Sequence, residues 1–581
     1  MKVAPTTKTT TACASPTQVM NWHQVEWGTC HTYVRKLQAR IVKATKEGRW
    51  GKVKALQHLL THSFSGKVLA VKRVTENTGK KTPGVDGETW STPQSKMDAA
   101  KSLRSRGYKA LPLKRVHIPK ANGKKRPLGI PTMKDRAMQA LYLLALEPIA
   151  ETLGDLNSYG FRPERCTADA MARCFTLLSK SNGPEWVLEG DIKGCFDNIS
   201  HTWMLNNIPT DKVILLKWLK AGFIEQKRLF STETGTPQGG IISPVLANMV
   251  LDGLERKLAK HFPKQTQKRI PNPTGTGKSI RVAVPSKQVH LIRYADDFVI
   301  TCTSREVLEN NIKPLVVEFL AARGLELSQE KTKITHIDDG YDFLGWNFRK
   351  YKGKLLIKPS KANIRRFLEK IREVIKVNAT AKQSNLINVL NPIIYGWGNY
   401  HKGVVAGEIF SQVDHEIWKA LWRWARRRHP NKGKRWIKGR YFHFINGRDW
   451  TFCTFGKKGS NEAKIIGFLS RIKSQRHIKI KSAANPFDPA WETYFEELRS
   501  HKMRKSISGI RDLLVLWRRQ KGTCPICGLK IYVDCEWVIH HIQPRSKGGS
   551  DKSPNRMMLH NNCHRQYHSQ FGLETGPLIR A

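Results

Sequence analysis

The chain has 581 residues, of which 40% are hydrophobic and 17 are tryptophan, so it is long enough for several domains with separate cores. Its 100 Lys and Arg residues outnumber its 47 Asp and Glu residues, which gives a formal net charge of +53. This charge indicates a polyanionic partner, above all nucleic acid, and the lack of an apolar run long enough to cross a bilayer argues against a membrane.

The N-terminal part is expected to be helical. The first twenty residues, MKVAPTTKTTTACASPTQVM, lack the apolar segment of a secretory signal. Residues 1–85 carry a mixed helical pattern that ends in the turn-rich stretch NTGKKTPGVDG, and we assign them to an N-terminal extension. From 86 to 358 short strands alternate with helices, which predicts an α/β or α+β body.

The most informative pattern of this body is LIRYADDFVITC at 291–302. Its two arms are predicted strands of a β-hairpin whose tip carries Asp296 and Asp297. An earlier predicted strand, 186–190, leads directly into Asp191. If these strands are neighbours the carboxylates converge, and like charges repel unless cations lie between them. The pattern predicts two Mg²⁺ ions about 3.5–4 Å apart that activate a 3′-hydroxyl, with a solvated acidic turn as the alternative.

In residues 359–480 the sequence pattern becomes helical and strongly basic. Ser360 is a predicted N-cap, and the apolar stripe that follows is typical of a helix with one buried face. The stretch 417–448 contains no Asp or Glu. Its candidate phosphate-binding residues are Arg426, Arg427, Arg428, Lys432, Lys434 and Arg435. Trp422, Trp424 and Trp436 either stack on unpaired bases or lie in a helical core, and the sequence leaves both interpretations open.

The C-terminal sixty residues predict a metal module. Cys524 and Cys527 form a C-x₂-C pair that is answered by His560 and Cys563 with the same spacing. Two such pairs are typical of a closed tetrahedral Zn²⁺ site, whereas a lone pair of cysteines would leave redox chemistry open. The eleven cysteines are scattered and lack the regular spacing of a disulfide framework, which also indicates a reducing compartment.

An ordered series of motifs carries a family resemblance. VHIPKANGKKRPLGIPTMKDRAMQ (116–139), SYGFRP (158–163) and the Asp191 segment are followed by TGTPQGGIISPVLANMVLD (234–252) and the YADD hairpin. LELSQEKTKITHI (325–337), YDFLGWNF (341–348) and NPIIYGWGNYH (391–401) complete the series. In this order and spacing the sequence resembles the reverse transcriptases encoded within group II introns. The resemblance implies a right-hand polymerase with fingers and palm, an α-helical thumb or maturase domain, and RNA-templated DNA synthesis from dNTPs.

The resemblance also implies roles for individual residues. Asp191 and Asp296 match the principal metal ligands, and Asp297 matches an auxiliary carboxylate. The residues that match nucleotide-binding positions are Lys120 and Arg126 for the triphosphate, Phe196 for the gate against a ribose 2′-hydroxyl, and Gln238 for the incoming nucleotide. The glycines after Gln238 would let the backbone approach the substrate. Alternatively, Phe196 is a core residue and the cations are ordinary surface charge.

Within the C-terminal module a second pattern resembles an HNH, or ββα-metal, endonuclease. His540, His564 and His568 match the ligands of one divalent ion. His541 matches the general base that activates water against DNA phosphate, and Asn555 matches the residue that orients it. Val538 departs from the family, which usually carries an acidic residue there. A structural zinc knuckle that binds DNA without cutting it is the alternative.

The expected whole is therefore a multidomain α/β and α+β protein. We expect an N-terminal extension at 1–85, fingers and palm at 86–358, a thumb at 359–480, a DNA-binding segment at 481–519 and a small zinc-containing endonuclease at 520–581. Such a protein would bind intron RNA, assist splicing, nick double-stranded target DNA and copy the intron into it. It would be cytoplasmic or nucleoid-associated in a bacterium, or organellar, and homodimerisation stays open.

Three rival functions stay open at this point. The first is a splicing factor without polymerase activity, and the second is a DNA endonuclease whose basic body only anchors it to RNA. The third, an RNA-templated RNA polymerase, is disfavoured by Phe196.

Overall fold

The computed structural model describes residues 21–119, 125–263, 266–271, 279–284, 287–455, 463–507 and 511–571. The first twenty residues, in which no secretory signal is expected, lie outside the described residues, and so does Lys120. Among the helices of the described part, none is long and apolar enough to span a membrane.

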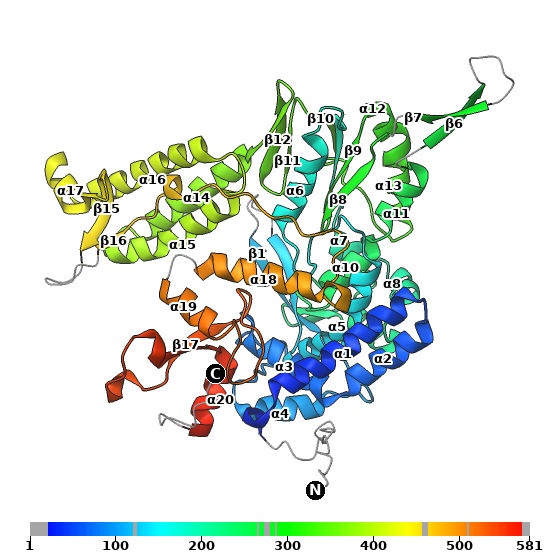
Figure 1. The fold of residues 1–581 in the computed structure, drawn as a ribbon, viewed down its shortest axis with the longest axis horizontal. Coiled ribbons are helices and arrows are strands. Elements are labelled where there is room, and N and C mark those ends of the chain that lie inside the picture. Colours follow the sequence, from blue (N-terminus) through cyan, green and yellow to red (C-terminus); the bar gives the residue numbers. More distant parts are fainter. Residues whose placement is uncertain are drawn as a thin grey trace, which may run out of the picture.

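The N-terminal helices wrap around one long buried helix (Figure 1). They are η1 (Trp22–Gln24), α1 (Trp27–Lys46), α2 (Trp50–His62), α3 (Phe64–Glu76) and α4 (Pro93–Ser102), and the central helix is α5 (Met133–Leu153). The hydroxyl of Thr132 caps α5 by accepting a hydrogen bond from the backbone of Asp135. Because α5 is apolar on almost every side, α1, α2 and α3 all pack on it.

A small sheet in the fingers has the strand order β2-β1-β4-β5. Its strands are β1 (Leu113–Pro119), β2 (Lys125–Ile130), β4 (Phe223–Glu225) and β5 (Arg228–Phe230). Strands β1 and β2 form an antiparallel hairpin with Ile118 opposite Arg126. The hairpin therefore presents its basic residues beside the palm.

The palm is a four-stranded antiparallel sheet with the order β10-β3-β9-β8. Its strands are β3 (Trp186–Gly190), β8 (His290–Tyr294), β9 (Asp297–Cys302) and β10 (Lys333–His336). Leu188 and Ile300 face one hydrophobic core, whereas Val187 and Val299 face another. Both faces are covered, which explains why these strands read as continuous apolar runs rather than alternating ones.

Short elements surround this sheet (Figure 1). The helices are α6 (Thr167–Leu178), α7 (Cys195–Asn198), α8 (His201–Asn207), α9 (Lys212–Leu219), α10 (Ser243–Leu251), α11 (Leu254–His261), α12 (Arg305–Val307), η2 (Leu308–Ile312) and α13 (Lys313–Ala321). The hairpin β6 (Thr266–Pro271) and β7 (Ser279–Val284) projects from the palm. A three-stranded sheet of β11 (Tyr341–Phe343), β12 (Trp346–Tyr351) and β13 (Lys354–Pro359) leads to the next domain.

The thumb projects to one side as a helical bundle (Figure 1). It comprises α14 (Lys361–Val377), α15 (Gln383–His401), α16 (Gly407–Arg428), α17 (Lys434–Tyr441), the strands β14 (Phe442–Ile445), β15 (Arg448–Phe455) and β16 (Ala463–Ile465), and η3 (Leu469–Arg471). The predicted N-cap is confirmed, since Ser360 accepts a hydrogen bond from the backbone of Asn363. Phe367, Ile371 and Ile375 are buried as the stripe predicts.

The C-terminal part crosses back to the N-terminal helices (Figure 1). It contains η4 (Pro489–Trp491), α18 (Glu492–Ile507), α19 (Arg511–Arg519), β17 (Trp537–His541), η5 (Arg545–Lys547), η6 (Ser553–Asn555), β18 (Arg556–His560) and α20 (Asn561–Phe571). Strands β17 and β18 pair antiparallel, and α20 packs on both. This gives the ββα arrangement that the histidine pattern predicts.

Candidate active sites

The palm brings the predicted catalytic carboxylates to one end of its sheet. The hairpin arms β8 and β9 pair with Tyr294 opposite Asp297, so Ala295 and Asp296 form the turn. Strand β3 lies beside β9 with Gly190 opposite Phe298, and Asp191 follows directly. Ala295 has a φ of 57°, a left-handed conformation that costs a non-glycine residue about 1–2 kcal/mol. The neighbouring strands predicted from the sequence are confirmed.

The carboxylates act on one another electrostatically. Burial raises the pKa of Asp296, and the charge of Asp191 raises it further. The carboxyl group of Asp297 is crowded although the residue reaches solvent, and burial followed by the charges of Asp296 and Asp191 raises its pKa to about 6. Burial is the larger cause of both shifts, and the neighbouring negative charges add to it.

A lysine partly neutralises this charge. Lys331 donates a hydrogen bond of 2.8 Å to Asp191 Oδ2, and this bond raises the pKa of the lysine. Within the described part of the chain, the three carboxylates do not form a group whose ligand oxygens all lie within 4.8 Å of one another. Asp191 is instead paired with Lys331. An all-oxygen donor set with surplus charge fits hard cations such as Mg²⁺.

A polar chain connects the fingers with the palm beside these acids. Arg126 Nε donates to Gln238 Oε1 at 2.7 Å, and Gln238 Nε2 lies 3.4 Å from both carboxylate oxygens of Asp197. The structure thus brings Arg126 and Gln238 together, as their proposed roles require. Gly239 differs from expectation: a Cβ there would lie 2.6 Å from the carbonyl oxygen of Gly129, so its small size serves packing against β2.

The surroundings of Phe196 bear on both of its interpretations, the gate against a ribose 2′-hydroxyl and the core residue. It is 8% exposed and belongs to the main hydrophobic core, in agreement with the alternative interpretation. Its ring also meets the exposed ring of Phe161 edge to face at 6.3 Å. Phe161 lies in the motif SYGFRP, and Phe196 lies in the segment that follows Asp191. Their contact places Phe196 at the edge of the core.

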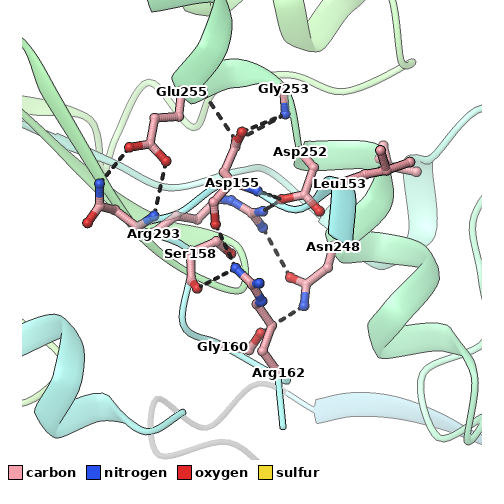
Figure 2. A network of polar contacts seen from close by, with 12 residues as sticks. Leu153, Asp155, Ser158, Gly160, Arg162, Asn248, Asp252, Gly253, Glu255 and Arg293 are labelled. Atoms are coloured by element: carbon pink, nitrogen blue, oxygen red, sulfur yellow. Dashed lines mark hydrogen bonds and ion pairs between the residues drawn. The ribbon is translucent and has the colours of Figure 1, made fainter. Parts of the chain in front are cut away.

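A buried ion network supports the hairpin from behind (Figure 2). Arg293 is 1% exposed, pairs with Asp252, and donates to Asn248 Oδ1 at 3.1 Å and to the carbonyl of Ala295 at 3.2 Å. Asn248 donates to the carbonyl of Gly160 at 2.8 Å. Arg293 therefore holds the hairpin tip to the helix that follows the Gln238 loop.

Replacement of Arg293 by Met should destabilise the protein by about 3–5 kcal/mol, because it leaves Asp252 buried without its cation. Denaturant unfolding monitored by tryptophan fluorescence measures this change in stability. The double variant Arg293→Met/Asp252→Leu, which removes both charges, should recover part of the stability. Equal stability of Arg293→Met and wild type would contradict the network's importance.

The C-terminal module holds two groups of potential metal ligands. Cys524, Cys527, His560 and Cys563 place one ligand atom each within 4.8 Å of all the others. His540, His564 and His568 form a second such group. A third group of the described residues, Cys166, Asp169 and His477, ties the segment after η3 to α6 through a 2.8 Å contact of His477 with Asp169.

Both groups of the module fit metal ions. Three cysteines and one histidine are the donor set of a structural Zn²⁺ site. In the histidine group, His540 Nε2 is buried without a hydrogen-bond partner, and His564 Nε2 lies 3.1 Å from His568 Nε2. A buried imidazole nitrogen aimed at two others is suited to hold a divalent cation.

His541 lies next to this group on β17 and is paired with an acid. Its Nε2 lies 2.7 Å from Asp551 Oδ1, which also accepts hydrogen bonds from Arg545. The contacts from His541 and then Arg545 lower the pKa of Asp551. Asn555 exchanges hydrogen bonds with the backbone of Gln543 and donates to Ser550, so it braces the loop after β17.

The thumb presents the predicted basic surface. Arg426, Arg427, Lys432, Lys434 and Arg435 are exposed. Arg428 is partly buried and donates to the carbonyls of Ala379 and Ala381 at 2.7 and 3.0 Å. Trp424 is 4% exposed and donates to the carbonyl of Asn378, which rules out base stacking, whereas Trp436 is 43% exposed and Trp422 is partly buried.

Sequence reasoning missed several residues that the structure singles out. A basic groove of about 680 Å³ on the thumb is lined by Arg372, Lys376, Arg423, Arg427 and Arg428, of which the last two were predicted. Lys331, Asp197, Arg293 and Asp551 were also missed. Three of them lie inside motifs or next to predicted residues, which is the only signal that the sequence offers for them.

Comparison with known families gives four consecutive matches. Residues 22–103 match the N-terminal domain of reverse transcriptase, and residues 118–348 match Reverse transcriptase (RNA-dependent DNA polymerase). Residues 364–442 match the Group II intron, maturase-specific domain, and residues 524–570 match HNH endonuclease. These matches follow the order of the predicted domains.

Individual relatives agree with these families. Protein YkfC of Escherichia coli (strain K12) is 34% identical over 309 residues, which cover 48% of this chain and 78% of YkfC. Group II intron-encoded protein LtrA of Lactococcus lactis subsp. cremoris is 31% identical over 328 residues, which cover 48% of this chain and 54% of LtrA. Maturase-like protein 1 of Euglena gracilis is 24% identical over 401 residues, covering 66% of this chain and 78% of that protein.

The matched domains are those of an RNA-directed DNA polymerase that also carries maturase-specific and HNH endonuclease domains. The chain belongs to the family of group II intron-encoded reverse transcriptases. The chain spans about half the length of LtrA.

Proposed function

We propose that the palm site adds deoxynucleotides to a DNA 3′ end by two-metal catalysis on an RNA template. The position of Asp191, Asp296 and Asp297 at the same end of neighbouring palm strands is the observation that supports this proposal. Asp191 and Asp296 would hold both Mg²⁺ ions, with Asp297 as an auxiliary ligand. The ions would lower the pKa of the attacking 3′-hydroxyl and stabilise the charge on the leaving pyrophosphate.

The residues around the acids would select and position the nucleotide. Arg126 would contact the triphosphate with its guanidinium, and its hydrogen bond to Gln238 supports a shared role in holding the nucleotide. Lys120 has the same proposed role by family resemblance. Phe196 would exclude a ribose 2′-hydroxyl by bulk, at the edge of the core beside Phe161.

The HNH module would nick one strand of the target DNA. His540, His564 and His568 would hold one divalent ion, and His541 would take a proton from the attacking water. Asp551 orients and stabilises the imidazolium that forms, because it accepts a hydrogen bond from the other side of that ring. Asn555 would keep the loop in place, and Zn²⁺ on Cys524, Cys527, His560 and Cys563 would hold the module together.

The thumb would bind intron RNA through its exposed cations and the basic groove. We further propose the domain division at 85, 358, 480 and 519, with the segment 481–519 contacting target DNA. The protein would act as a ribonucleoprotein in a bacterial cytoplasm or nucleoid or in an organelle. Homodimerisation remains an untested proposal.

Target-primed reverse transcription tests this function as a whole. The protein, its intron RNA and a labelled target duplex are mixed with dNTPs, and products are resolved on a denaturing gel. We expect a nicked strand that is extended by a copy of the RNA. Nicking without extension would favour an endonuclease with an RNA-anchoring body, and splicing without either product would favour a splicing factor alone.

The Mg²⁺ requirement of primer extension should increase as the pH falls from 7.5 to 6. Protons compete with Mg²⁺ for the carboxylates, and the pKa of Asp297 is about 6 while that of Asp296 is raised as well. Below these values the protonated forms dominate and metal binding weakens. Mg²⁺ titrations of initial rate at several pH values measure the change, and a half-maximal concentration independent of pH would contradict it.

RNA binding should weaken steeply with salt, because the cations of the thumb release counterions from phosphates. Replacing Arg426, Arg427 and Arg435 by Gln should lower the slope of log affinity against log salt by roughly 0.7–0.9 for each phosphate interaction that is removed. Lys257→Gln on α11 is the matched control, since that ammonium group pairs with Glu318 and lies outside the thumb. Filter binding across salt concentrations measures the slopes, and equal slopes for all variants would refute the assignment.

A further inference from the structure

The helix that carries two endonuclease ligands is docked on the N-terminal helices. The buried side chain of Gln566 on α20 donates to the backbone carbonyls of His23 and Val25, at 3.2 and 3.3 Å. These acceptors lie more than 540 residues away in sequence. The elements η1 and α20, which are far apart in the sequence, therefore lie side by side (Figure 1).

The acceptors belong to a fixed platform. Trp22 and Val25 are 2% and 4% exposed and belong to the main core that also contains the palm residues Leu188 and Ile300. Trp22 meets Trp27 edge to face at 5.0 Å. Because buried side chains anchor η1 on both sides of His23, its carbonyls cannot shift without disturbing the core.

A glycine lets the zinc-binding loop approach the same platform. A Cβ at Gly28 would lie 2.7 Å from the carbonyl oxygen of Cys527, closer than side-chain carbon atoms approach an oxygen. Gly51 offers a comparison, because Trp50–Gly51 starts α2 as Trp27–Gly28 starts α1. A Cβ at Gly51 meets nothing within 4 Å. Of these two positions, only position 28 needs a glycine, because the backbone of Cys527 leaves no room there for a Cβ atom.

The docking contact lies on the side of α20 opposite the two histidines that are proposed metal ligands. His564 and His568 are one turn apart and meet the His540 ring at centroid distances of 5.2 and 5.1 Å. Gln566 lies two residues from each, about 200° around the helix axis, and faces the platform. The helix is thus held between β17 on one side and η1 on the other.

We propose that the N-terminal helices hold α20 in its metal-binding position, with Gly28 and Gln566 as positioning residues of the endonuclease site. The polymerase fingers would then set the orientation of the nuclease, and nicking would depend on residues at the opposite end of the chain. The inference rests on the proposed endonuclease function for its catalytic consequence, whereas the docking itself does not depend on it.

Four single substitutions in the full chain test the proposal. Gly28→Val places a branched side chain against Cys527, and Gly51→Val makes the same change at the matched open position. Gln566→Glu keeps the shape but turns a donor toward two carbonyl oxygens into an acceptor, and Gln566→Ala only removes the donor. The undocking effect should therefore be larger for Gln566→Glu than for Gln566→Ala.

Three measurements are made on each zinc-loaded variant. Hydrogen exchange of the peptides covering 21–30 and 561–571 reports docking. Calorimetric titration with Ni²⁺, with His540→Ala as the blank, reports the affinity of the histidine site. Primer extension on an annealed RNA template and DNA primer reports the polymerase.

In Gly28→Val and Gln566→Glu we expect faster exchange in both peptides and an affinity for Ni²⁺ that is lower by about 10-fold or more. Zinc content and primer extension should stay close to those of wild type, and Gly51→Val should match wild type throughout. Equal exchange and equal Ni²⁺ affinity in Gly28→Val and Gly51→Val would overturn the inference. If wild type binds Ni²⁺ and docks but never nicks DNA, the proposed endonuclease function fails while the positioning role stands.

Discussion

Replacing Asp296 by Asn is expected to reduce primer extension at least about 1,000-fold. The change removes one negative charge from the space between Asp191 and Asp297 and takes a ligand from both proposed metal ions. The fold should be preserved, because the side chain keeps its size at a surface turn. The measurement is incorporation of dNTPs into a labelled primer on an RNA template at saturating Mg²⁺.

Asp338→Asn is the matched control for this experiment. Asp338 and Asp339 form a second adjacent acidic pair, but they lie in a turn after β10 where Asp338 is exposed. Extension by this variant should equal wild type, and nicking by Asp296→Asn should be unchanged. Comparable decreases in both variants would mean that surface charge, rather than a metal site, controls the reaction.

Replacing His541 by Ala should reduce nicking of target DNA at least about 100-fold, the usual contribution of a general base. Extension of a primer that is already nicked should not change, since the palm and the module are separate sites. Asp551→Asn should give a smaller decrease, because it leaves the imidazole in place and removes only its partner. Nicking is measured on a supercoiled or end-labelled target duplex.

The exposed His261 on α11 provides the control for histidine removal. His261→Ala should nick and extend like wild type. If His541→Ala nicked normally while His540→Ala did not, the metal assignment would stand but the general base would have to be another group. Normal nicking by both variants would favour a purely structural module.

The features of the molecule that follow local rules could be predicted from the sequence. Continuous apolar runs indicated the strands around Asp191 and Asp296, and the structure shows that these strands are neighbours. Ser360 and its stripe defined the start and buried face of α14. The spacing of Cys524, Cys527, His560 and Cys563 predicted that their side chains lie close together, because two short loops that bind one ion must converge.

The features that depend on distant packing could not be predicted. Arg293 reads as an ordinary charge within a strand, and only the fold shows that it is buried against Asp252. Lys331 meets Asp191 across 140 residues. Trp424 and Trp436 both follow an arginine in segments rich in basic residues, yet one is core and the other is exposed. Docking of Gln566 on η1 has no sequence signal at all.

Electron paramagnetic resonance of bound Mn²⁺ tests the central claim most directly. The complex is assembled on the His540→Ala background, with RNA template, a 3′-deoxy primer and the matching dNTP, so that only the palm site is observed. We predict two Mn²⁺ ions per protein with a spin coupling that corresponds to about 3.5–4 Å, and loss of the coupled signal in Asp191→Asn or Asp296→Asn. A single uncoupled ion, or a coupled pair that survives both substitutions, would contradict two-metal catalysis at the palm.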